Sequence, residues 1–123
     1  MAMHKAQALI TVTLGMLAVI LGAFGAHALK GALSEHYMDV WKTAVMYQMF
    51  HVLVALCLIL NSKAQTYTLT VWFFLLGIVL FSGSLFLLAV TGITWIGAIT
   101  PIGGICFVLG WARLVMDLSK RQY

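Results

Sequence analysis

The sequence predicts an all-α fold, a bundle of four transmembrane helices, on three observations. First, 63% of the 123 residues are hydrophobic and only 8% are charged, with a mean hydropathy of +1.07, whereas soluble domains are about half apolar and about a quarter charged. Second, four apolar stretches approach the ~20 residues that a spanning helix needs. Third, runs such as LGIVLF are continuous and lack the alternation of spanning strands. We expect residues 1–123 to form a single integral membrane domain.

The first predicted span covers residues 8–26. Its short basic start and the small-residue segment Ala26-His27-Ala28 resemble a signal peptide. However, its apolar run of about 19 residues is longer than the roughly 7–15 of a signal core. We therefore interpret it as an uncleaved helix.

The second predicted span covers residues 44–60, and its helix is expected to extend outside the membrane. Gly31 is a suitable stop for the first helix, and Ser34 is a suitable N-cap for the second. Glu35 would then lie in the first turn, where a negative charge interacts favourably with the helix dipole.

The third and fourth predicted spans cover residues 69–90 and 96–116. In the fourth, Thr100 and Pro101 have the pattern of an N-cap followed by proline at the first helical position. The helix is therefore expected to be broken at Pro101, with residues 91–100 forming a partly helical turn. A simple kink at Pro101 is the alternative.

Basic residues predict the orientation. With four spans, the two termini and the middle loop share one side of the membrane. Five Lys and Arg lie on that side and two on the other, which places the N- and C-termini in the cytoplasm and the protein in the cell (inner) membrane. The net charge of +4 is scattered and forms no basic stripe, so no nucleic-acid partner is expected.

Aromatic residues near the span ends support this layout, because Trp and Tyr concentrate at membrane interfaces. Trp41 and Trp95 fall near the outer interface, and Tyr67, Trp72 and Trp111 fall near the inner one.

Small residues mark the predicted helix-packing surfaces, because close approach rather than hydrophobicity drives helix association in lipid. They occur in the first, third and fourth spans. The set comprises Gly15, Ala18, Gly22, Gly25, Ala26, Gly83, Gly103, Gly104 and Gly110. Packing inside the bundle is favoured over packing in a homo-oligomer.

Polar residues in the spans form a candidate cluster in the outer half of the bundle. Its members are His27, Gln48, His51, Ser82, Ser84 and Thr100. An intramembrane histidine can shuttle protons or bind a metal or haem. Hydrogen bonding of Gln48 and His51 across helices is the favoured alternative. The three acids lie outside the spans, and no catalytic residue, metal site or cofactor is predicted.

Four segments in order carry a family resemblance: GAFGAHALK (22–30), YQMFH (47–51), FSGSLFLL (81–88) and GAITPIGG (97–104). Together they closely resemble the small membrane protein family called domain of unknown function 423, whose eukaryotic relatives are called transmembrane protein 256-like. The resemblance covers nearly the whole chain, although Phe50 and Phe86 stand where tyrosine is equally expected.

This resemblance implies a bacterial inner-membrane or eukaryotic organellar protein of several spans, with no established activity. It marks motif positions that are mostly small, polar or helix-breaking. They are Gly25, His27, Lys30, Gln48, His51, Ser82, Gly83, Ser84, Thr100, Pro101 and Gly104.

Three hypotheses for function follow. The first is a structural or interaction protein, not an enzyme, whose partners are the lipid bilayer and either copies of itself or a larger membrane complex. The alternative is a small oligomeric transporter or channel for a neutral or anionic solute. The second alternative is cofactor or metal binding through His27 and His51.

Overall fold

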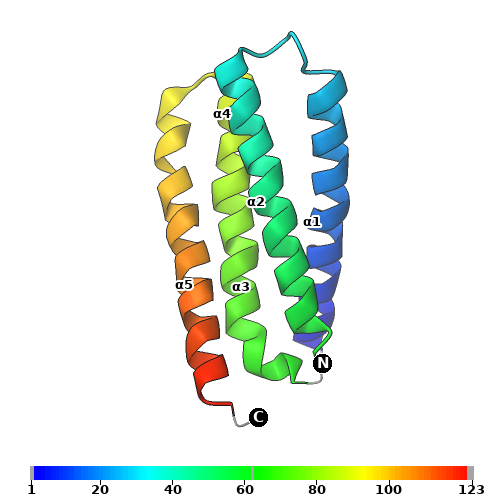
Figure 1. The fold of residues 1–123 in the computed structure, drawn as a ribbon, viewed down its shortest axis with the longest axis vertical. Coiled ribbons are helices and arrows are strands. Elements are labelled where there is room, and N and C mark those ends of the chain that lie inside the picture. The colour runs from blue at the N-terminus through cyan, green and yellow to red at the C-terminus, as the bar shows by residue number, and fades with distance from the viewer. Residues whose placement is uncertain (1, 62, 122–123) are drawn as a thin grey trace.

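The structure, a computed structural model, describes residues 2–61 and 63–121, which are helical with short connections and contain no strand. Figure 1 shows antiparallel helices, with the start of α1 and the end of α5 at the same end of the bundle. Four helical segments are long and apolar enough to cross a membrane, namely His4–His27, Glu35–Ile59, Ala64–Thr91 and Thr94–Ser119. The predicted all-α fold with four membrane-spanning helices is confirmed.

The first two segments are continuous α-helices, α1 (Ala2–His27) and α2 (Glu35–Ile59). The Ser34 hydroxyl accepts a hydrogen bond from the Tyr37 amide at 3.2 Å, so the predicted N-cap is confirmed and α2 begins well before residue 44. α1 ends earlier than Gly31, because the amides of Ala28 and Leu29 both bind the Phe24 carbonyl. Gly31 instead lies in the turn that follows α1, in the left-handed conformation with φ +83°.

The third segment is composite. It consists of the 3₁₀ turn η1 (Ala64–Tyr67), α3 (Thr68–Gly77), the π-helical turn η2 (Ile78–Ser82) and α4 (Gly83–Thr91). No feature of the sequence indicated the π turn. Such a turn adds one residue to an α-helix, so the side chains of α4 are rotated relative to those of α3.

The fourth segment is broken near Pro101, as predicted. Gly92 ends α4 in the left-handed conformation, and a 3₁₀ turn η3 (Thr94–Ala98) precedes α5 (Thr100–Ser119). The structure therefore has the partly helical turn rather than a simple kink. The predicted N-cap is wrong, because α5 already begins at Thr100 and the Thr100 hydroxyl is hydrogen-bonded to the Ser84 hydroxyl at 2.6 Å.

The main packing contacts join α1 to α2, α2 to the α3–α4 segment, and α5 to α3. Figure 1 shows α1 and α5 on opposite sides of the bundle. The buried apolar core lies where α2, α3 and α5 approach one another. It is formed by Val52, Ala55, Val71, Phe74, Leu75, Ile78 and Phe107.

Three of the predicted packing glycines lie at tight contacts. A Cβ atom on Gly25 would overlap the Trp41 ring, one on Gly103 would overlap the Phe81 backbone, and one on Gly110 would lie 2.6 Å from the Phe74 ring. Gly15 and Gly22 have looser α2 neighbours, Val52 and Val45, and Ala18 is fully buried.

The remaining predicted packing residues lie in open surroundings. A Cβ atom on Gly83 would have no neighbour within 4 Å, and one on Gly104 would make an ordinary contact of 3.9 Å, while Ala26 is exposed. Gly77 was not among the predicted packing residues, but a Cβ atom on it would lie 2.5 Å from the Phe107 ring. The tight glycine contacts thus lie between α1 and α2 and between α5 and the α3–η2 segment.

Candidate functional site

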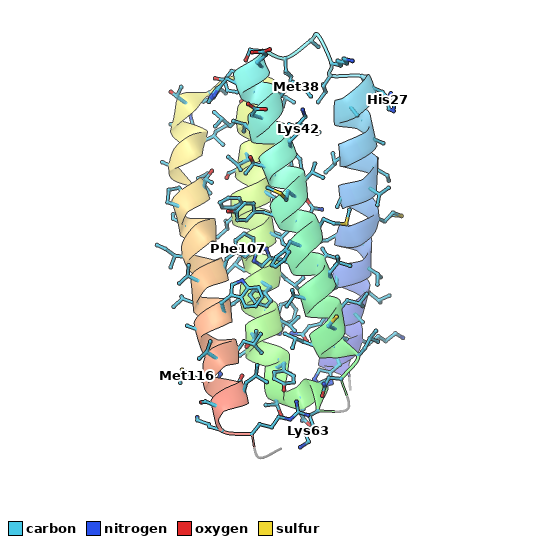
Figure 2. The ribbon with its side chains drawn as sticks, in the orientation of Figure 1. His27, Met38, Lys42, Lys63, Phe107 and Met116 are labelled. Atoms are coloured by element: carbon cyan, nitrogen blue, oxygen red, sulfur yellow. The ribbon has the colours of Figure 1, made fainter. Side chains whose placement is uncertain are left out.

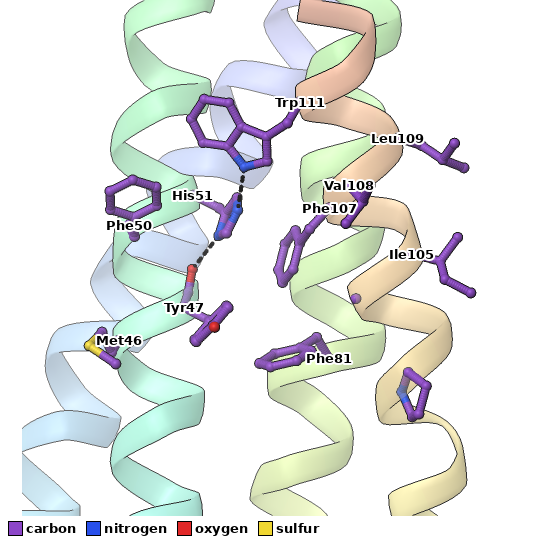
Figure 3. A pocket seen from close by; sticks show the side chains of 12 residues that line it. Met46, Tyr47, Phe50, His51, Phe81, Ile105, Phe107, Val108, Leu109 and Trp111 are labelled. Atoms are coloured by element: carbon purple, nitrogen blue, oxygen red, sulfur yellow. Dashed lines mark hydrogen bonds between the residues drawn. The ribbon is translucent and has the colours of Figure 1, made fainter.

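His51 occupies the centre of the candidate site, on the side of α2 that faces α5. Its side chain is 4% exposed. Figure 3 shows its two hydrogen bonds: the ring Nδ1 lies 2.8 Å from the Tyr47 carbonyl oxygen, and the Trp111 indole N–H donates to Nε2 at 3.1 Å. The second bond links α2 to α5.

These partners fix the protonation pattern of His51. An indole N–H only donates and a carbonyl only accepts, so Nε2 is the acceptor and the proton is on Nδ1. The ring is therefore neutral, with both nitrogens engaged, and it stacks on Phe107 with centroids 3.7 Å apart. In this arrangement neither nitrogen is free to bind a metal or to receive a proton without breaking a hydrogen bond.

A groove of about 810 Å³ lies beside His51, between α2 and α5. Aromatic rings dominate its wall, including Tyr47, Phe50 and Phe81. Met46 and Val108, which also line it, are more than half exposed, so the hollow opens on the side of the bundle. No charged side chain is among its lining residues, and it is suited to apolar groups.

The other candidates except His27 also link helices, and of these Gln48, Ser82 and Ser84 are buried. The Gln48 amide donates to the Leu14 carbonyl of α1 at 2.7 Å. The Ser82 hydroxyl donates to the Ala44 carbonyl of α2 at 2.7 Å. The Ser84 and Thr100 hydroxyls are hydrogen-bonded to each other and join α4 to α5. Each of these bonds spans two segments that are distant in the sequence.

The six candidates do not form one continuous cluster. Within the described part of the chain, Ser84 and Thr100 are the only pair of them joined by a direct hydrogen bond. Gln48 bonds to α1 while His51 bonds to α5, although they are three residues apart on one helix. His27 is exposed at the end of α1 opposite Lys63, as Figure 2 shows.

Sequence reasoning missed two tryptophans and a glutamine that also link helices. It placed Trp41 and Trp111 at interfaces, whereas the Trp41 indole donates to the Leu21 carbonyl at 2.9 Å and Trp111 binds His51. Gln7, 1% exposed, donates to the Thr68 carbonyl at 2.9 Å. The spacing of Gly103, Phe107 and Gly110, with Trp111 beside them, is a helical stripe that could have indicated this packing face.

Arg113 and Asp117 form an ion pair at 3.2 Å, one turn apart on α5. No group of three or more His, Cys, Asp or Glu residues that could hold a metal ion occurs in residues 2–61 and 63–121.

Comparison with known proteins gives consistent matches. A family model described as "Protein of unknown function (DUF423)" matches residues 21–104. The chain belongs to the DUF423 family. It is 47% identical over 107 residues to the UPF0382 membrane protein SH2409 of Staphylococcus haemolyticus, covering 85% of this chain and 88% of that protein. It is also 47% identical over 109 residues to the UPF0382 membrane protein YwdK of Bacillus subtilis, covering 85% and 89%.

These relatives confirm the resemblance found in the sequence. They are named as bacterial membrane proteins, which agrees with the four apolar helices of this DUF423 protein. No solved structure matches the chain. The family description and the names of the relatives indicate a membrane protein and no specific activity, so the function must be argued from the geometry.

Proposed function

We propose that this DUF423 protein is a structural or interaction protein of the cell (inner) membrane and not an enzyme. In this proposal its helices form a single integral membrane domain with both termini in the cytoplasm. Its partners are the bilayer and either copies of itself or a larger membrane complex. Its polar side chains hold the bundle together, and its apolar outer faces contact lipid or membrane partners.

The observation that supports this proposal most directly is that the buried polar side chains form hydrogen bonds between helices. Gln48, Ser82 and His51 each bind a group on another helical segment. In lipid, hydrogen bonds between helices and close contacts of small residues replace the hydrophobic effect as the forces for association. A bundle joined in this way is stable and can present its outer faces to lipid or to membrane partners. The neutral His51, with both nitrogens engaged, supports a packing role over acid–base chemistry.

The orientation in the proposal is supported by charge. The basic residues Lys5, Lys63, Lys120 and Arg121 belong to the same end of the bundle, where α1 begins and α5 ends, and they outnumber Lys30 and Lys42 at the other end. An excess of basic residues is typical of the cytoplasmic side. Cysteine accessibility at residues 36 and 120 in intact cells tests this orientation.

Replacement of His51 by leucine tests the packing role. His51→Leu removes the acceptor of the Trp111 indole N–H, and we expect a loss of about 0.6–1.7 kcal/mol in unfolding free energy, from the average to the largest contribution of hydrogen bonds between membrane helices. Reversible unfolding in bicelles measures it. In a double-mutant cycle with Trp111→Phe, the two effects should be less than additive, because both variants remove the same bond.

His27→Leu is the matched control, because the side chain of that histidine is exposed and has no hydrogen-bond partner among the described residues. It should change the unfolding free energy by less than about 0.5 kcal/mol.

Native mass spectra of the purified wild-type protein should show a defined oligomer or a co-purifying membrane protein. A stoichiometric small molecule that His51→Leu loses while the fold is retained would instead assign a ligand site to His51 and overturn the proposal.

A further inference from the structure

Two hollows between α1 and α2 are joined end to end. One has a volume of about 770 Å³ and lies at the end of the bundle where α1 stops and α2 starts. The other, of about 530 Å³, continues along the two helices toward the middle of the bundle. Ala26, Met38 and Lys42 line both. Figure 2 shows Met38 and Lys42 near the end marked by His27.

The end hollow carries balanced charge. Lys30, Lys42, Glu35 and Asp39 line it, two cations and two anions. All four side chains are exposed, and in the described parts of the chain none of them forms an ion pair with another. Their charges therefore surround the hollow without neutralising one another directly, and their sum is zero.

The inner hollow is apolar apart from Lys42 at its mouth. Its floor is made of small residues of α1, Gly22 and Gly25, and its wall includes Val45 and Leu53 of α2. From Lys42 to Leu53 the helix rises about 16 Å at 1.5 Å per residue. That is about half of the ~30 Å hydrocarbon layer, the depth that the acyl chain of one leaflet occupies.

We propose that this joined site binds one glycerophospholipid whose headgroup carries both a phosphate and a primary amine. One of its two acyl chains lies in the apolar hollow, with the headgroup in the charged one. The phosphate accepts charge-assisted hydrogen bonds from Lys30 and Lys42, and the ammonium group donates to Glu35 and Asp39. This inference concerns a lipid site on the α1 side of α2 and goes beyond the proposed structural function.

The charge pattern distinguishes this headgroup from other common ones. A purely anionic headgroup would meet the two lysines but would also lie beside two carboxylates, which repel it. A choline headgroup is zwitterionic, but its quaternary ammonium has no N–H to donate. The ethanolamine headgroup satisfies both pairs of side chains.

Lipid titration followed by native mass spectrometry tests the proposal. The protein is purified in mild detergent and mixed separately with phosphatidylethanolamine, phosphatidylglycerol and phosphatidylcholine of identical acyl chains. We expect one phosphatidylethanolamine per chain to be retained preferentially. The double variant K30Q/K42Q should weaken its retention by about fivefold for each lysine removed, since a basic residue near a lipid headgroup contributes about that factor. Lys63→Gln, at the other end, should leave retention unchanged.

Blocking the apolar hollow gives an independent measurement. Ala26→Phe places a ring where the two hollows join, and it should reduce retention of phosphatidylethanolamine by about tenfold or more. Ala23→Phe is the matched control, because Ala23 is also exposed on α1 but lines neither hollow. Circular dichroism and thermal unfolding establish that both variants are folded.

Asp39→Asn examines the amine side of the headgroup. It should reduce the preference for phosphatidylethanolamine over phosphatidylglycerol, because it removes a carboxylate that binds the ammonium and repels the anionic lipid. Equal retention of the three lipids by the wild-type protein would refute the proposal. Equal retention by Ala26→Phe and Ala23→Phe would also refute it, and neither result would affect the proposed structural function.

Discussion

Gly103→Ala is expected to destabilise the bundle by about 1–3 kcal/mol, the usual cost of adding a methyl group to a packed contact. The added Cβ would overlap the backbone of Phe81 in the π turn η2. A backbone cannot move aside as the end of a flexible side chain can, so α5 must separate from η2. Unfolding free energy in bicelles, or the thermal midpoint in detergent, measures the effect.

Gly104→Ala provides an adjacent control. Its Cβ would meet Phe81 at an ordinary 3.9 Å, and alanine favours helix by up to about 1 kcal/mol over glycine. We therefore expect Gly104→Ala to be neutral or slightly stabilising. If Gly103→Ala were as stable as Gly104→Ala, the close approach of α5 to η2 would be incorrect.

Trp41→Ala is expected to cost about 3 kcal/mol, at the lower end of the range for truncating a buried large aromatic residue. Trp41 is 4% exposed, lies against Gly25, packs edge-on against Phe86 with ring centroids 4.6 Å apart, and donates its indole N–H to Leu21. The truncation leaves a cavity between α1, α2 and α4 and removes a bond between two helices. The same unfolding measurements apply.

Trp95→Ala is the control for this substitution, because Trp95 lies on η3 and is 68% exposed. The Trp95→Ala substitution should change the unfolding free energy by less than about 0.5 kcal/mol. Trp41→Phe keeps most of the volume and loses only the hydrogen bond, so it should fall between wild type and Trp41→Ala. A similar loss for Trp41→Ala and Trp95→Ala would contradict the buried position of Trp41.

Hydropathy predicts the main features of the fold, because the bilayer requires long apolar helices and their number and order follow directly. The break near Pro101 was also predictable, since proline and Gly92 both interrupt a helix. The π turn at Ile78–Ser82 was not, because a continuous apolar run has the same composition in an α or a π conformation. The π turn packs closely against Gly103, which is more than 20 residues further along the chain, and a local apolar pattern does not indicate such a contact.

The depth of the candidate residues in the membrane was predictable, but the neighbouring helix that each side chain contacts was not. The position of Gln48 and His51 within their span follows from the sequence, and so does their placement on similar faces of α2. The helix to which Gln48 or His51 bonds depends on how α1 and α5 are placed around α2. A single sequence does not specify this placement. Trp111 was therefore interpreted as an interface residue, although its indole binds His51.

The order of packing along the chain has a consequence for how the protein is made. α1 packs on α2, α2 on the α3–α4 segment, and α5 on α3, so each helix finds a principal neighbour close to it in the sequence. Closing short connections costs little chain entropy, and a low mean sequence separation between contacts favours rapid folding. The bundle can therefore assemble one helical hairpin at a time during synthesis. The first two helices form their main packing contacts before the last helix is made.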